Sequence, residues 1–321
     1  LLMAYLLYIP ENKIERSYKK AKPRFIRKNA RKFAILTTYV IAILILVIII
    51  NFILPVLIES INELIGNMEN YYNRVIETYN NLPEDSIFKT EKVYNALKEL
   101  QNFDVQQYLS LDRITGYVKG VVGFATGIFD VFVAFVVSIY ILAERNEILS
   151  FFKKLTKSMF KEKTVNKIER YFYRANGVFF KFISSQFIDA LIVGILATIV
   201  MKILNIKYAT LLGFAIGLFN MIPYFGAIIA ISISAIITLI TGGLSKAAIM
   251  LVSIIILQQI DANIINPKII GDSLEISPIL VILSVTIGGG YFGVIGMFLG
   301  VPVAAILKIL VNDYIDNKLQ V

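Results

Sequence analysis

The sequence predicts an all-α polytopic membrane protein with a helical external segment and a C-terminal inverted repeat, each half of which is a helix plus a re-entrant hairpin. Of the 321 residues, 57% are hydrophobic and only 17% are charged, whereas soluble domains usually hold about 45–50% apolar residues. Long apolar runs are separated by loops that are alternately rich in basic and in acidic residues. The tripeptide Tyr-Phe-Gly also occurs twice in the C-terminal half, each time where an apolar stretch is interrupted.

The composition excludes several classes of chemistry. The chain contains no Cys, His or Trp, which rules out thiol nucleophiles, disulfides, Cys or His metal ligands and Ser-His-Asp triads. It also has no Walker A motif for ATP. We therefore expect no enzyme, no cofactor and no metal site. The net charge of +9 is typical of basic cytoplasmic loops in a membrane chain and does not indicate nucleic-acid binding.

The first half of the chain predicts two crossings around an external segment. Residues 1–32 are predicted to be a truncated hydrophobic tail and a basic cytoplasmic loop. Between Pro10 and Lys32 there are ten Lys or Arg but only two Glu. The apolar run from Phe33 to Ile58 then crosses outward, with Pro55 as a kink near the far interface. Residues 59–116 carry ten acidic and five basic side chains, as expected outside.

An apolar seam predicts that the external segment is helical. Its residues follow a 3,4 spacing over about three heptads. The seam pairs subunits in one interpretation, which predicts a homo-oligomer. In the other it packs on a returning helix through Val93, Leu97, Leu100 and Phe103. The seam comprises Ile58, Ile61, Ile65, Met68, Tyr72, Val75 and Tyr79.

The second crossing returns the chain to the cytoplasm. Tyr117 to Ala143 forms that crossing, so residues 33–143 contain two membrane helices. Residues 144–181 carry ten Lys or Arg against four Glu and read as a basic cytoplasmic segment. Residues 182–321 then form the transport core. We expect a multi-pass protein of the cell membrane with a cytoplasmic C-terminus and the lipid bilayer as its first partner.

The transport core predicts the inverted repeat. Phe182 to Leu204 crosses outward, but Tyr208 to Ile222 gives only about 22 Å of helix against a core of about 30 Å. A hairpin over 208–241 that dips into the membrane and returns, followed by an inward crossing over 246–266, explains this shortness. A second hairpin over 277–311 then enters from the inside. The alternative is ordinary full spans from residue 208 onward.

The order and spacing of several segments resemble the autoinducer-2 exporter family, also called AI-2E-type permeases. The resemblance covers about residues 20 to 315. It implies a membrane transporter, with export of the furanone autoinducer-2 proposed for some members and sodium/proton antiport for others. The matching segments are 208–213, 220–226, 259–263 with Pro267 and Gly271, Ser277-Pro278, and 289–297 with Val301-Pro302. At Ser184-Ser185-Gln186 the chain departs from the family's usual Gly-Gln.

Candidate pathway residues are polar or conformationally special positions near the two interruptions. Intramembrane ionisable side chains are costly and therefore functional hypotheses, whereas Pro and Gly free the backbone at a break. Capping or pairing with nearby Lys or Arg is the structural alternative for the two carboxylates. The candidates are Gln186, Asp189, Asn220, Pro223, Tyr224, Gly226, Gln259, Asp261, Asn263, Tyr291 and Gly293.

Three functions follow from these patterns. The first is a secondary transporter or permease that exports a small polar solute. The second is a sodium/proton antiporter, for which Asp189 or Asp261 would carry the monovalent cation or the proton. The third is a structural membrane scaffold, which ranks last because a scaffold does not need two costly helix breaks.

Overall fold

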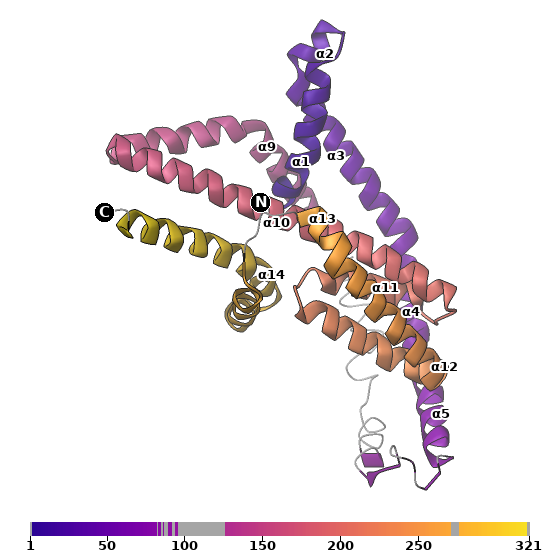
Figure 1. The fold of residues 1–321 in the computed structure, drawn as a ribbon. Coiled ribbons are helices and arrows are strands. Elements are labelled where there is room, and N and C mark those ends of the chain that lie inside the picture. Colours follow the sequence, from indigo (N-terminus) through magenta and orange to yellow (C-terminus); the bar gives the residue numbers. More distant parts are fainter. Residues whose placement is uncertain are drawn as a thin grey trace.

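The computed structural model describes residues 2–81, 126–270 and 276–319, with isolated positions between 83 and 95. Every regular element in these described ranges is a helix (Figure 1). Four stretches are long and apolar enough to cross a membrane: Ala30–Gly66, Glu162–Ile203, Phe225–Ile269 and Pro278–Asp316. The architecture is thus all-helical, as predicted, and fits a membrane protein.

The N-terminal part is built from α1 (Leu2–Lys19), α2 (Arg24–Lys28) and α3 (Ala30–Ile48). From α3 the chain continues through a π-helical turn, η1 (Ile49–Ile53), into α4 (Leu54–Gly66). Pro55 lies in the first turn of α4, where its missing N–H costs little. The π-helical turn η1 precedes Pro55, and α3, η1 and α4 together form one continuous apolar helical stretch.

The part of the chain that carries the predicted apolar seam does not form the predicted single helix. α4 ends at Gly66, and α5 (Met68–Asn80) begins after Asn67, whose φ of −101° and ψ of 7° leave the helical range. The buried residues on these helices are Leu57 and Tyr71, neither of which belongs to the predicted seam. The residues proposed to pack from a returning helix lie outside the described residues, so subunit pairing stays a prediction; they are Val93, Leu97, Leu100 and Phe103.

The largest buried core lies where α10 (Glu162–Ile203), α11 (Ala209–Asn220) and α12 (Phe225–Ile260) meet. α9 (Thr126–Met159) runs beside α10 as a long antiparallel partner (Figure 1). Glycines let α10 and α11 approach closely, because a methyl group on Gly217 would lie 2.6 Å from the Ala190 carbonyl oxygen. The core side chains include Val193, Met201, Leu212, Ile216, Met250 and Ile254.

α12 is interrupted at Gly243, where φ is 81° and ψ is 175°. The predicted end of the first hairpin at Thr241 and the predicted start of the next crossing at Lys246 flank this interruption. Past Ile260 the chain forms a second π-helical turn, η2 (Asp261–Ile265), and then α13 (Asn266–Ile270). η2 therefore brings Asp261 to the point where the regular hydrogen-bond ladder changes.

α14 (Pro278–Leu319) folds back on itself at Gly293, where φ is 60° and ψ is −146°. Glycines allow its two arms to touch, since a methyl group on Gly288 would overlap the backbone of Gly296 and one on Gly300 would lie against the Ser284 carbonyl oxygen. Both pairs are symmetric about residue 292, which defines a helical hairpin. Its re-entrant placement in a membrane, and its relation to the first hairpin by an inverted repeat, stay predictions.

Candidate functional site: a buried carboxylate–amide cluster

Three polar side chains from three helical segments meet inside the transport core. Asn220 Nδ2 donates a hydrogen bond to Asp189 Oδ2 at 2.9 Å and lies 3.5 Å from Asp261 Oδ2. Asp189 is only 1% exposed and Asp261 is 5% exposed. We call Asp189, Asn220 and Asp261 the carboxylate–amide cluster. One amide thus bridges two buried carboxyl groups.

Local backbone structure places each member of the cluster. Asp189 lies on the face of α10 that packs on α11, and Asn220 is the last residue of α11, which ends just before Pro223. Asp261 is the first residue of η2. Gln186, one turn before Asp189, donates from Nε2 to the Met221 carbonyl oxygen at 3.1 Å. Gln186 therefore satisfies backbone left open at the end of α11.

The hydrogen bonds within the cluster do not satisfy all of its carboxyl oxygens. One oxygen of each carboxyl group, Oδ1 of Asp189 and Oδ1 of Asp261, is buried without a hydrogen-bond partner. The Asn266 side chain is a further neighbour of Asp189. Two buried carboxylates are expensive without compensation, so a proton or a cation is the natural third component of this site.

The structural alternatives for the two carboxylates do not match the observed pairs. Arg174 forms an ion pair with Asp313, with Nη1 and Oδ2 3.0 Å apart, rather than with Asp189. Within the described ranges neither Asp189 nor Asp261 makes an ion pair, and Lys268 does not neutralise Asp261. Both carboxyl groups instead face the amide of Asn220.

The cluster offers two carboxyl groups and one amide. Across the described segments no group of three or more His, Cys, Asp or Glu side chains converges. Two carboxylates with amide and backbone oxygens are hard ligands that can hold a small monovalent cation or share a proton.

Two predicted pathway residues lie away from the cluster. Gln259 and Asn263 are both exposed, and Asn263 Nδ2 donates to the Gln259 carbonyl oxygen at 2.7 Å. They sit one turn apart on the outer surface of the α12–η2 segment. The structure therefore brings together Gln186, Asp189, Asn220 and Asp261 but not these two.

The first Tyr-Phe-Gly occupies a tight turn between α11 and α12. Tyr224 has φ of 63° and ψ of −57°, and the Phe225 N–H donates to the Pro223 carbonyl oxygen at 2.8 Å. This is a γ-turn with a positive φ at its centre, a strained conformation for tyrosine. Gly226 is required by contact, because a methyl group there would overlap the Phe219 carbonyl oxygen.

The second Tyr-Phe-Gly lies at the fold-back of α14. Gly293 has the positive φ, and a side chain there would meet open space, so conformation rather than contact requires glycine. Tyr291 is 81% exposed, compared with 52% for Tyr224. Both tyrosines therefore project outward, and neither contributes to the carboxylate–amide cluster.

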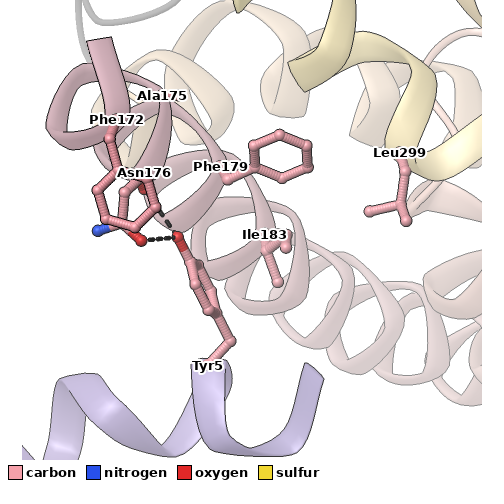
Figure 2. A pocket seen from close by; sticks show the side chains of 7 residues that line it. All are labelled: Tyr5, Phe172, Ala175, Asn176, Phe179, Ile183 and Leu299. Carbon is pink, nitrogen blue, oxygen red and sulfur yellow. Dashed lines mark hydrogen bonds between the residues drawn. The ribbon is translucent and has the colours of Figure 1, made fainter. Parts of the chain in front are cut away.

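A separate cavity of about 440 Å³ lies between α1, α10 and α14. Figure 2 shows its mainly apolar lining, with Phe179, Ile183 and Leu299 on one side and Tyr5 reaching up from α1. The Tyr5 hydroxyl lies 2.6 Å from Asn176 Oδ1 and 2.9 Å from the Asn176 carbonyl oxygen. This polar pair joins α1 to α10, and the cavity offers little to a polar solute.

No sequence pattern predicted a polar cluster that joins α4 and α5 to the loop between α10 and α11. Lys207 Nζ lies 2.6 Å from Glu63 Oε1 and 2.8 Å from the Tyr71 hydroxyl, which in turn lies 3.0 Å from the Tyr208 hydroxyl. The hydrogen bond to Glu63, followed by that to Tyr71, raises the pKa of Lys207. We call Glu63, Tyr71, Lys207 and Tyr208 the Lys207 cluster.

Comparison with known proteins places the chain among transport proteins. The model of the AI-2E family transporter matches residues 19–316. YueF of Bacillus subtilis, named as a transport protein, is 24% identical over 96% of this chain and 81% of its own length. YrrI of the same organism, named likewise, is 31% identical, but the match covers 43% of this chain and only 39% of YrrI.

Two relatives carry more specific names. The AI-2 transport protein TqsA of Escherichia coli is 28% identical over 39% of this chain and 36% of its own length. A sodium-lithium/proton antiporter of Halobacillus andaensis is 23% identical over 77% of this chain and 67% of its own length. The family model covers nearly the whole chain, as the resemblance predicted, and the helices are apolar enough to span a membrane. The chain therefore belongs to the AI-2E transporter family of membrane transport proteins.

Proposed function

We propose that this chain is a secondary transporter that exports a small polar solute and uses the carboxylate–amide cluster as its ion or proton site. The observation that carries the proposal is the bridging of two buried carboxyl groups by the single amide of Asn220. Buried carboxylates at membrane depth are retained where they bind, relay or couple to an ion.

The position of the cluster supports a role in transport rather than in packing. It lies at the end of α11, four residues before Tyr224, which is the centre of the γ-turn that leads into α12. Interrupted helices free backbone groups that can coordinate a substrate or coupling ion. A change in protonation or ion occupancy at Asp189 or Asp261 would therefore act, through Asn220, on the turn between the two helices.

Sodium/proton antiport is the second candidate, and one observation favours it. The cluster consists of carboxylate and amide groups alone, and in it Asp189 and Asp261 each keep an oxygen without a partner. Such a set suits a monovalent cation or a proton better than an organic solute. The antiporter relative from Halobacillus andaensis is consistent with this candidate.

Flux measurements with the purified chain in proteoliposomes test the proposal. Under the main candidate, outward movement of a polar solute accelerates when a proton or sodium gradient is imposed. Under the second, sodium moves against protons with no organic solute present. If neither gradient changes any flux while the protein is inserted and folded, the cluster is not a coupling site and the proposal is wrong.

A further inference from the structure

A second polar site lies beside α5 and shares no residue with the carboxylate–amide cluster. A pocket of about 590 Å³ is bounded by one face of α5, by Lys207 and by Thr241 near the interruption of α12. Its volume is typical of small-molecule sites. Unlike the cavity of Figure 2, its lining is polar.

One helix lines the pocket with exposed polar side chains. Asn70, Asn73, Arg74 and Glu77 all line the pocket from α5, and within the described part of the chain none of their side chains makes a hydrogen bond or an ion pair. The wall opposite them is already satisfied, since Lys207 is bound by Glu63 and Tyr71 and Thr241 donates to the Ile237 carbonyl oxygen.

The positive and negative charges around the pocket nearly cancel, so neither an anion nor a cation is favoured as its ligand. Glu63 neutralises Lys207, and the remaining charged side chains are one Arg and one Glu. An anion would place its charge beside Glu77, and a cation would place its charge beside Arg74. An apolar molecule would leave the amides without hydrogen-bond partners at a cost.

Neutral molecules rich in hydroxyl groups match this lining best. A hydroxyl both donates and accepts, as do the two amides, while Arg74 only donates and Glu77 only accepts. We propose that the pocket beside α5 binds a small neutral polyhydroxylated solute, such as a sugar, through Asn70, Asn73, Arg74 and Glu77. The charge balance of the loops predicts that this face is external, so the ligand would arrive from outside the cell.

Calorimetric titration of the purified full chain in detergent tests the site without any need for transport. The probes are ribose as a neutral polyhydroxylated solute and sodium phosphate as an anion. We expect saturable binding of ribose and none of phosphate. Glu77→Gln, which removes the charged acceptor while keeping its shape, should weaken ribose binding about tenfold.

Glu69→Gln is the matched control, because Glu69 is also exposed on α5 but does not line the pocket. Its ribose affinity should equal that of the wild type, and circular dichroism should give the same helix content for both variants. The proposal is overturned if ribose does not saturate, if phosphate saturates in its place, or if Glu69→Gln weakens ribose binding as much as Glu77→Gln.

Discussion

At the scale of single residues, Tyr224 combines a positive φ with a position at the centre of the γ-turn. Its positive φ costs about 1–3 kcal/mol for a side chain of this kind, so the turn stores strain between α11 and α12. Strain of this kind persists only where the surrounding structure requires it. Here the proline before Tyr224 and the tightly packed Gly226 after it hold the turn in place.

Replacement of Tyr224 by glycine should therefore stabilise the fold and alter function. We expect Tyr224→Gly to raise the unfolding free energy by about 1–3 kcal/mol and to reduce solute flux, because the exposed ring is lost from the turn. Thermal unfolding in detergent and proteoliposome flux measure the two effects. Tyr291→Gly is the control, since Tyr291 lies in helical backbone, where glycine destabilises by about 1 kcal/mol. Equal stability changes in both variants would contradict the strain at Tyr224.

At the scale of elements, the Lys207 cluster fixes α4 and α5 against the loop between α10 and α11. Tyr71 is its central member, since its hydroxyl lies between Lys207 and Tyr208 and the residue is 4% exposed. The Lys207 ammonium group also lies 5.4 Å from the Tyr71 ring centre and 5.1 Å from that of Tyr208. These contacts join segments more than 130 positions apart.

Removal of the Tyr71 hydroxyl should destabilise the protein measurably. We expect Tyr71→Phe to lower the unfolding free energy by about 1–3 kcal/mol, because Tyr208 loses a buried partner and Lys207 loses an acceptor. Tyr72→Phe, at the neighbouring position on α5, should have no comparable effect. Chemical denaturation in detergent gives both values. If the two variants are equally stable, the hydroxyl network does not hold α5.

The same cluster predicts a defined pH dependence. The folded-state pKa of Lys207 is raised, so its contribution to stability is complete below the ordinary lysine value of about 10.4 and is lost only as pH rises through the raised value. The stability difference between wild type and Lys207→Met should therefore stay constant across the neutral range and shrink only in strong alkali. A difference that disappears near neutral pH would contradict this assignment.

Several elements could be predicted from the sequence, and others could not, for physical reasons. Pro223 lies at the first interruption and Gly293 at the second, and because both residue types favour breaks in a helix, both interruptions could be predicted from the sequence. The seam from Ile58 to Tyr79 was wrong as a single helix, because a regular apolar period says nothing about a backbone break at Asn67. The partnership of Tyr71 with Lys207 depends on tertiary contact and leaves no local pattern.

At the scale of the whole molecule, the helical class and the family were evident from hydropathy and motif order. The candidate site was only partly evident. The sequence marked three residues as candidates because polar side chains are costly in a membrane: Asp189, Asn220 and Asp261. Sequence periodicity could not predict that one amide bridges both carboxyl groups. It also could not separate them from Gln259 and Asn263, which share the same segment of polar residues but face outward.

The charge distribution predicts the orientation of the whole chain. Lys22 and Lys157 should face the cytoplasm and Glu84 the outside. Because the chain has no cysteine, single cysteines at these positions give an unambiguous readout with a membrane-impermeant thiol reagent on intact cells. We expect labelling at position 84 alone. Labelling at position 22 or 157 but not at 84 would show that the orientation is reversed.

If the two buried carboxyl groups couple transport to an ion, proteoliposome flux should change when their charges are removed. Asp189→Asn and Asp261→Asn preserve shape and remove only charge and titration. We predict that each variant inserts and folds but that the double variant loses all dependence of flux on the imposed proton or sodium gradient. Asp316→Asn, an exposed position near the end of α14, should behave as wild type. Undiminished gradient-dependent flux in the double variant would show that Asp189 and Asp261 do not couple transport to an ion.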